Sequence, residues 1–472
     1  MRTHHPSQHH SAVRPSPDAP LTTGPPPEAS EGPPPEASEA SESPSPAPTG
    51  RPPSGVAAEL APLLEHFLPD GVPVRITFWD ESSIGEDHRA GSVRVTSPDA
   101  VRHLCWSPGE LGLGRAYVAG HIDIDGDIVE VLAALRTRRL RSMPAPVSMP
   151  AIVSGLRRAG AWGAPLPAPR EETRQRGVLH SRRRDAAAIS HHYDVGNDFY
   201  RLVLGPSMTY SCARFVTPDS TLEDAQVAKF DLVCRKLGLH EHTGATLLDV
   251  GCGWGSLAIH AARRYGARVV GVSISREQVA LARARVHAEG LDGLVDIRLQ
   301  DYRDLGGEHF DAISSVGMFE HVGAKRIPEY FATLRPLLGP HGRLLNHAIS
   351  SAGGTQFGGR SFVGRYVFPD GELIDVGDVV LAMEDAGFEV RDVESLREHY
   401  AHTLRRWVAN LEASWDEAVE LVGAGRARVW RLYMAGSVNS FQDGGISVHQ
   451  VLGVVPDAHG RSGMPATRDG YA

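Results

Sequence analysis

The sequence predicts an α/β fold built on a mostly parallel sheet, with a smaller amino-terminal α+β domain before it. Three observations favour this class. Strand-like apolar runs alternate with helical runs in the second half of the chain, and a glycine-rich turn joins one of these strands to the next helix. In addition, 472 residues with 41% hydrophobic content suffice for more than one core. We therefore expect two folded domains.

The first residues of the chain lack the composition of a folded domain. Residues 1–55 are rich in Pro, Ser, Ala and Glu, and residues 24–31 are repeated as 32–39. Such a segment cannot bury enough apolar surface to fold, so we expect a disordered tail. We expect a second, flexible tail at 457–472.

The smaller domain is expected at 56–141. Its expected elements are a helix at 57–67 and strands at 72–78 and 91–95. Further on, Ile122, Ile124 and Ile128 stand among aspartates, which favours an exposed strand or turn. A calcium loop is disfavoured because the glutamate of an EF-hand is missing, and no metal site is expected.

A linker is expected at 142–180, where Pro, Ala and Arg are frequent, and the basic triplet 182–184 follows it. The triplet has two interpretations. It can be the solvated start of a helix, or it can contact anionic lipid headgroups, which attract basic residues at a membrane surface.

The main domain is expected at 181–456. Its strand-like runs are 246–250, 268–274, 295–300, 310–316 and 343–349, and helical runs such as 276–289 and 327–338 end before a glycine. Parallel strands place their carboxyl ends at one edge, where ligands of such sheets bind. We therefore expect the polar residues after these strands to form one site.

The turn after the first of these strands is the most informative motif. Asp249 precedes Gly251, Gly253 and Gly255, and a helical run begins at Ser256. The glycines allow a sharp turn and a close approach of ligand to backbone. Since a dinucleotide fingerprint needs glycine where Ser256 stands, the pattern suits S-adenosylmethionine, whose ammonium group Asp249 can meet. A tight turn in another doubly wound domain is the alternative.

Other polar residues have a structural and a functional interpretation. Ser273 and Gln278 follow the second strand, and Gln278 either contacts a ligand or completes a capping box with Ser275. Glu320 follows the fourth strand among apolar residues, which raise the pKa of a carboxyl, but it can also cap a helix. Cys212 and His347 are each compatible with simple packing.

Charge and cysteine content narrow the class of protein. A net charge of -9 argues against a general nucleic-acid binder, and four scattered cysteines form no disulfide or zinc pattern. No apolar run reaches the length of a membrane span, and the N-terminus lacks a signal core. We expect a reduced, cytoplasmic protein.

Taken together, these motifs resemble the cyclopropane-fatty-acyl-phospholipid synthases and the related mycolic acid cyclopropane synthases. The motifs that carry the resemblance, in order from residue 191 to 407, are HHYDVGNDFYRLVLGPSMTYSCARF, LLDVGCGWGSLAIHAARRYGARVVGVSISREQ, RLQDYRDL, SVGMFEHVG, RLLNHAIS, RYVFPDGELI and REHYAHTLRRW. In the smaller domain, ELGLGRAYVAG also resembles the longer bacterial members, whereas the Pro-rich tail has no counterpart.

The resemblance implies a class I methyltransferase (Rossmann-like) fold with a seven-stranded sheet. It implies methyl transfer from S-adenosylmethionine to the double bond of an unsaturated acyl chain in a phospholipid. Bound bicarbonate would serve as the base, held by Cys212, Glu320, His347, Ile349 through its backbone, and Tyr400. The cofactor residues that the resemblance implies are Tyr210, Ser211, Gly251, Gly253, Ser273, Ile274, Gln278, Tyr302 and Val316. We add to them Asp249 and Gly255 from the glycine turn and Asp301 from the end of the third strand.

The same resemblance implies peripheral association with the inner face of the membrane and a homodimer. A carbocation on the acyl chain would need aromatic faces, and the candidates are Tyr193, Phe199, Tyr200 and Phe319. Asn346 and Ala348 stand where many cyclopropane synthases have leucine and threonine, which leaves a methylene- or methyl-branched product open. A small-molecule methyltransferase and a non-catalytic lipid-binding module are weaker alternatives.

Overall fold

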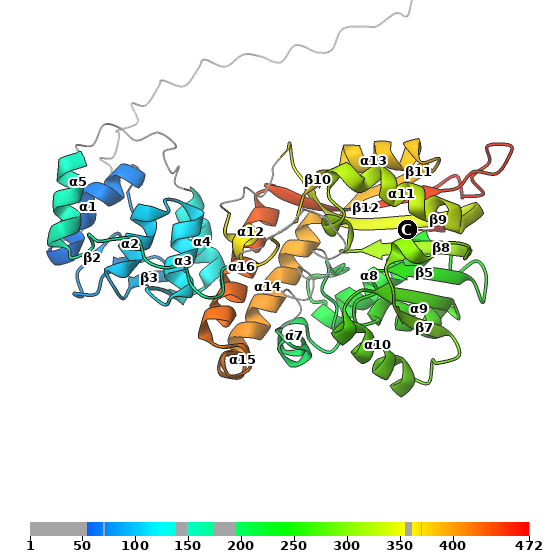
Figure 1. Cartoon of the computed structure of the whole chain (residues 1–472), viewed down its shortest axis with the longest axis horizontal. Coiled ribbons are helices and arrows are strands. Elements are labelled where there is room, and N and C mark those ends of the chain that lie inside the picture. The colour runs from blue at the N-terminus through cyan, green and yellow to red at the C-terminus, as the bar shows by residue number, and fades with distance from the viewer. Residues whose placement is uncertain are drawn as a thin grey trace, which may run out of the picture. The chain divides into compact units, whose positions relative to one another are not determined.

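The computed structural model describes residues 54–68, 71–137, 149–173, 195–354, 361–369 and 371–471, all within one compact unit, Gly50–Ala472 (Figure 1). The expected tail before residue 54, the basic triplet 182–184 and Tyr193 lie outside the described residues. The described part confirms the expected α/β class, with a mostly parallel sheet between helices and a smaller sheet formed by residues nearer the N-terminus.

The main sheet has seven strands in the order β11-β12-β9-β8-β5-β6-β7, and β10 pairs with β9 beside this order. All pairings from β9 to β7 are parallel, whereas β12 runs antiparallel to β9 and β11. The strands are β5 (Thr246–Val250), β6 (Arg268–Ser273), β7 (Val295–Leu299), β8 (Phe310–Val316), β9 (Leu338–Ser351), β10 (Ile374–Asp375), β11 (Glu389–Ser395) and β12 (Ile446–Val454). The carboxyl ends of β5 to β8 therefore share one edge.

Helices cover both faces of this sheet because the strands are apolar on both sides. On β5, Leu247 packs with α8, α9 and α10, whereas Leu248 and Val250 pack with α11 and α13. These helices are α8 (Leu222–Lys236), α9 (Ser256–Tyr265), α10 (Arg276–Ala288), α11 (Ile327–Leu334) and α13 (Val376–Asp385). Local signals set their ends: Ser275 caps α10 by accepting a hydrogen bond from the Gln278 amide, and α9 stops at Gly266, whose φ is 66°.

A second sheet, with the order β2-β1-β3-β4, lies among residues nearer the N-terminus. Its elements and neighbours are α1 (Gly55–Phe67), β1 (Ile76–Thr77), β2 (Ser83–Ile84), β3 (Gly91–Val95), α2 (Asp99–Trp106), α3 (Glu110–Val118), β4 (Ile122–Gly126) and α4 (Ile128–Thr137). The expected strand at Ile122 and Ile124 is present, but its exposure was predicted wrongly. Both isoleucines are buried because strand alternation turns them inward and their aspartate neighbours outward.

Two segments differ from their expected character. Within the expected linker, α5 (Met149–Arg158) packs against α1, and Arg158 pairs with Glu59 at 2.6 Å. In the expected flexible tail, Tyr471 is buried in the core beneath the main sheet, and Arg468 pairs with the buried Asp392 on β11. A buried aromatic ring and the ion pair between the exposed Arg468 and the buried Asp392 both hold this segment in place.

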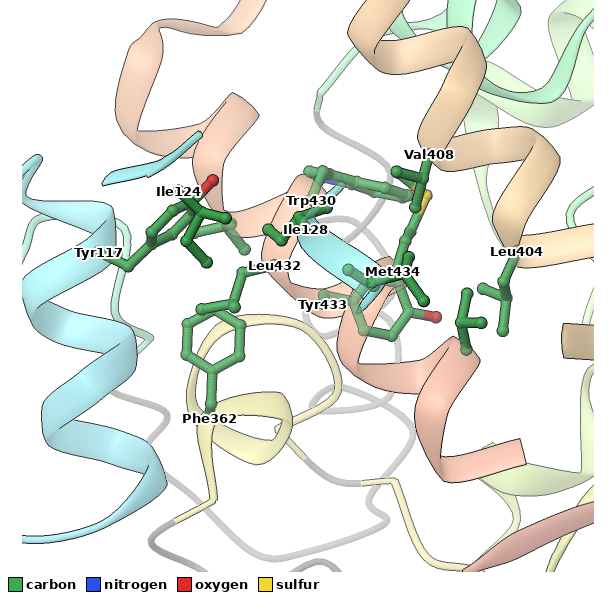
Figure 2. Close-up of a cluster of buried hydrophobic side chains, with 14 of the residues drawn as sticks. Tyr117, Ile124, Ile128, Phe362, Leu404, Val408, Trp430, Leu432, Tyr433 and Met434 are labelled. Carbon is green, nitrogen blue, oxygen red and sulfur yellow. The ribbon is translucent and has the colours of Figure 1, made fainter. Parts of the chain in front are cut away.

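A helical layer joins the two sheets. It contains α7 (Asn197–Leu204), α12 (Phe362–Tyr366), α14 (Arg397–Ala413), α15 (Trp415–Val422) and α16 (Ala424–Gln442). Figure 2 shows α16 in the middle of this layer, with Leu432 close to Phe362 and with Trp430 and Met434 close to Val408 of α14. Arg428 of α16 donates hydrogen bonds to the carbonyls of Tyr117 and Ile122, so α16 contacts the smaller sheet as well.

Short 3-10 helices complete the described chain: Tyr302–Asp304, Phe319–His321, Ala324–Arg326, Arg335–Leu337 and Arg468–Gly470. Three of them follow β7 or β8 and carry polar residues to the edge where the parallel strands end. None of the helices in the described ranges combines the length and apolar content needed to cross a bilayer.

Candidate active site

The glycine turn between β5 and α9 has the backbone that its sequence predicts. Gly251, Gly253 and Gly255 have φ values of 76°, 55° and 78°, a region that other residues rarely adopt. A Cβ atom at Gly251 would lie 2.9 Å from Met318, whereas one at Gly253 would meet no atom within 4 Å. The turn is therefore packed against the protein at Gly251 and open at Gly253.

This open side faces a cavity of about 160 Å³ at the carboxyl ends of β5 to β8. Of the twelve residues expected to bind the cofactor, eleven line it: Tyr210, Ser211, Asp249, Gly251, Gly253, Ser273, Ile274, Gln278, Asp301, Tyr302 and Val316. Gly255 does not, because it is the N-cap residue before α9 and lies against Ala282 instead. The structure thus brings together residues from four of the seven sequence motifs.

Asp249 lies at the base of this cavity with only 2% of its surface exposed. Its Oδ1 accepts a 2.8 Å hydrogen bond from the Ser314 hydroxyl on β8. Burial raises the pKa of Asp249 to about 6, while that hydrogen bond and the positive charge of Lys229 oppose the rise. The carboxylate is therefore ionised at neutral pH and can meet a cation.

The capping interpretation of Gln278 holds for its backbone but not for its side chain. Its backbone amide donates to the Ser275 hydroxyl, as in a helix cap, but its side-chain Oε1 accepts a 2.9 Å hydrogen bond from Ser273. The reciprocal bond of a capping box is absent from Ser275, whose amide donates to the Ser273 hydroxyl. The Gln278 side chain is therefore held at the cavity rather than over the helix end.

Asp301 and Tyr302 form the opposite rim of the cavity. Both oxygens of Asp301 accept hydrogen bonds from the Arg303 guanidinium, at 2.8 and 2.6 Å, and Oδ1 also accepts from the Arg303 amide. The Tyr302 ring packs edge-on against Tyr330 at 5.5 Å. Asp301 is thus oriented by a neighbour that the sequence analysis did not single out.

The residues expected to hold bicarbonate lie beside this cavity and do not line it. Glu320 does not cap a helix, because its Oε1 accepts a 2.7 Å hydrogen bond from the backbone amide of Ile349. His347, two residues earlier on β9, has its Nδ1 3.2 Å from the Gln450 amide nitrogen. The other ends of these two side chains, Glu320 Oε2 and His347 Nε2, are buried without a hydrogen-bond partner in the described structure.

Burial also sets the charge of these groups. It raises the pKa of Glu320 to about 7 and lowers the pKa of His347 to about 3, so His347 is neutral at physiological pH. Burial raises the pKa of the Cys212 thiol strongly, so this thiol keeps its proton. Cys212 approaches the Leu396 carbonyl, which also accepts the backbone hydrogen bond of Tyr400. Cys212 and Tyr400 are therefore held by the same turn of chain.

Aromatic residues form a dense cluster around Tyr210, which we call the aromatic cluster. The Tyr210 ring lies 5.4 to 5.7 Å from three others, and its hydroxyl is 3.2 Å from the Tyr433 hydroxyl. The cluster contains Phe199, Tyr200, Tyr210, Trp254, Trp407, Trp430 and Tyr433. Phe199 and Tyr200 belong to it as proposed candidates, but Phe319 does not, because it packs against Tyr330 and Phe331.

Sequence reasoning missed several residues of the site. Trp407, Trp430 and Tyr433 come from α14 and α16, and only the spacing of Trp430 and Tyr433 on one helix face hinted at a shared surface. Gln450, the partner of His347, could be identified only from the pairing of β12 with β9. Lys229 lines the cavity from α8 and is 1% exposed, and no sequence signal marked it.

Comparison with known proteins agrees with this geometry. The family model for mycolic acid cyclopropane synthetase matches residues 180–451. A Mycobacterium tuberculosis protein described as a probable fatty acid methyltransferase is 42% identical over 420 residues, which cover 86% of this chain and 97% of the relative. The cyclopropane-fatty-acyl-phospholipid synthase of Escherichia coli K12 is 35% identical over 360 residues, which cover 76% of this chain and 87% of the relative.

Among solved structures, the mycolic acid cyclopropane synthase CmaA1 complexed with SAH and CTAB is similar with a TM-score of 0.53 and 34% identity. The match covers 57% of this chain and 97% of that protein. Residues 180–451, which the family model matches, contain the strands β5 to β11, the residues that line the cavity and the residues beside it. The chain therefore belongs to the mycolic acid cyclopropane synthetase family and is an S-adenosylmethionine-dependent methyltransferase that acts on lipid.

Proposed function

We propose that this enzyme transfers a methyl(ene) group from S-adenosylmethionine to the double bond of an unsaturated fatty acyl chain in a phospholipid and forms a cyclopropane ring. The observation that carries the proposal is the pair of buried, unpartnered atoms Glu320 Oε2 and His347 Nε2 beside the cavity. Buried polar atoms normally have partners, and Glu320 is anchored on Ile349, two residues from His347, so these two atoms fit a small polar guest.

The cavity residues fit the cofactor. Gly253 leaves room for close approach, and Asp249 offers a buried carboxylate to the ammonium of the amino-acid end. Ser273 holds Gln278 against the cavity, where both can donate or accept hydrogen bonds. When bound, S-adenosylmethionine supplies an electrophilic methyl group. The protein residues orient that group and exclude water from it.

An alkene is a weak nucleophile, and its methylation leaves a carbocation on the acyl chain. The aromatic cluster offers ring faces that stabilise such a cation without forming a covalent bond to it. Cys212, held as a neutral thiol, would not be alkylated as a thiolate would. These features support a lipid substrate more than a polar small molecule.

Ring closure requires loss of a proton from the new methyl group. Cys212, Glu320, His347, the Ile349 amide and Tyr400 are the residues that would hold bicarbonate, which supplies a base when bound. Neutral His347 can donate or accept a hydrogen bond there, while Glu320 is already anchored on Ile349. We further propose that the enzyme meets its substrate at the membrane surface and forms a homodimer, as the family resemblance implies.

A branched acyl product is the second candidate. It is favoured by the 42% identical relative, which is described as a probable fatty acid methyltransferase rather than a cyclopropane synthase. The first step is the same, and only the fate of the cation differs. A hydride shift from the methylated carbon to the cationic carbon, followed by loss of a proton from the new methyl group, leaves a methylene branch. A separate hydride donor would then have to reduce that branch to a methyl branch.

Lipid mass spectrometry of cells that express this protein, supplied with isotope-labelled methionine, tests the function. A labelled acyl chain heavier by one methylene group and resistant to hydrogenation supports the ring. A product that takes up hydrogen supports the methylene branch, and the absence of any labelled acyl chain contradicts both.

The role of Glu320 is tested by Glu320→Gln. We expect this variant to lose product formation while it still binds SAH, because Glu320 does not line the cofactor cavity. Glu329→Gln, on the exposed side of α11, is the matched control and should keep full activity. Unchanged turnover of Glu320→Gln would refute the assigned role.

A further inference from the structure

Lys229 is a buried cation at the cofactor cavity that no part of the proposed mechanism uses. It lies in the middle of α8, is 1% exposed and lines the cavity. Its Nζ donates a 3.0 Å hydrogen bond to the Ser211 hydroxyl and lies 4.3 Å from the centre of the Phe230 ring. A hydroxyl and a ring face are weak compensation for a buried ammonium group.

A second buried lysine on the same helix shows the contrast. Lys236 is 0% exposed, and its Nζ lies 2.8 Å from Asp392 and 2.5 Å from Glu394. Within the described ranges, no carboxylate lies within 4 Å of the Lys229 ammonium. One buried lysine of α8 is thus paired with carboxylates of the protein, and the other faces the cavity.

Electrostatics around Lys229 fit an anionic ligand. Burial lowers the pKa of Lys229 to about 8, and the negative charge of Asp249 opposes this change, so most of the population stays protonated at neutral pH. Asp249 lines the same cavity, where it is bound to Ser314 instead of Lys229. Besides the Asp301–Arg303 pair and Arg326, the cavity therefore presents Asp249 as an anion and Lys229 as a cation that are not paired with each other.

This arrangement matches the amino-acid end of the cofactor, which carries one ammonium and one carboxylate. Asp249 complements the ammonium, and the carboxylate then needs a positive partner. We propose that Lys229, together with the Ser211 hydroxyl that it holds, binds the carboxylate of S-adenosylmethionine and thereby positions the methyl donor. The inference rests on the cofactor alone and is independent of which lipid product forms.

The test compares two ligands that differ at this end. SAH carries the amino-acid group, whereas 5′-methylthioadenosine shares its nucleoside and thioether but lacks the ammonium and the carboxylate. In Lys229→Met, isothermal titration calorimetry should show an affinity for SAH about 10- to 100-fold weaker, the size expected for a charge-assisted hydrogen bond. The affinity for 5′-methylthioadenosine should change by less than about twofold.

Two further variants keep the test sharp. Ser211→Ala should weaken SAH binding in the same selective way but by less, and it leaves the helix intact if Lys229→Met does not fold. Lys236→Met is the matched control, because it removes a buried lysine of the same helix away from the cavity, and it should leave the ratio of the two affinities unchanged. An equal loss for both ligands in Lys229→Met, or no loss for SAH, would overturn the assignment.

Discussion

The backbone amide of Ile349 donates a 2.7 Å hydrogen bond to Oε1 of Glu320, which ties the loop after β8 to strand β9. This bond uses one oxygen of the carboxylate and leaves the other buried without a partner in the described structure. His347 lies two residues before Ile349, on the same face of the strand. The proposed bicarbonate site is therefore partly preformed, and its guest has to share or displace the Ile349 amide.

The first prediction concerns the pH dependence of stability. A glutamate carboxyl ordinarily has a pKa of 4.5, and burial raises the pKa of Glu320 to about 7. Between these values the native state binds more protons than the unfolded state, so the free energy of unfolding falls as pH rises. Glu320→Gln removes this contribution. The free energy of unfolding of the variant, measured relative to that of the wild type, should therefore rise by about 3 kcal/mol as pH increases across that range.

Guanidinium unfolding at a series of pH values measures this difference. Asp249, whose pKa is also raised, is present in both proteins and cancels in the comparison. The exposed variant Glu329→Gln should show no such trend. A difference that does not depend on pH would mean that Glu320 is ionised as readily in the native state as in the unfolded chain.

The second prediction separates two glycines of the cofactor turn. Gly251→Ala places a methyl group 2.9 Å from Met318 in a left-handed backbone, so it should destabilise the fold by more than the ~1–2 kcal/mol of backbone strain alone. Gly253→Ala meets no protein atom within 4 Å, so it should cost only that strain but block the cofactor. Chemical denaturation and SAH titration distinguish them, and the reverse order of stability would contradict the packing.

The third prediction concerns Asn346, which departs from the pattern of many cyclopropane synthases. Strand alternation places Asn346 on the face opposite His347, where its Oδ1 lies 3.5 Å from the Tyr330 hydroxyl in the core under α11. Asn346→Leu should therefore leave the lipid product unchanged and cost about 1 kcal/mol for the lost hydrogen bond. Product analysis by mass spectrometry checks this, and a switch between ring and branch would show that Asn346 acts on the cation.

The fourth prediction tests the C-terminal segment. Tyr471 is 4% exposed and belongs to the core beneath the main sheet, so Tyr471→Ala should lower the free energy of unfolding by about 2–4 kcal/mol. Thr467→Ala, an exposed neighbour, should be nearly neutral. If both variants were as stable as the wild type, the segment would be the flexible tail that its sequence predicts.

Much of the fold follows from local patterns. The strands β5 to β8 and the glycine turn were predictable because alternation, helix caps and left-handed glycines depend on residues close together in the chain. The main errors came from tertiary contacts. The sequence predicts that Ile122 and Ile124 are exposed among aspartates, but α4 and the adjoining strand bury them. It also predicts a flexible tail around Tyr471, whose ring is buried in the core beneath the sheet.

The sequence by itself determined the α/β class, the cofactor turn and the residue types of the site, because each depends on spacing along the chain. Only the tertiary structure decided how those residues meet. In the folded chain Glu320 accepts a hydrogen bond from Ile349, and His347 lies beside Gln450. The aromatic cluster combines residues of three helices and two loops. Lys229 faces the cavity, whereas Lys236 is paired with carboxylates. These contacts depend on how distant segments pack and on which charges lose their water, and no local pattern records either.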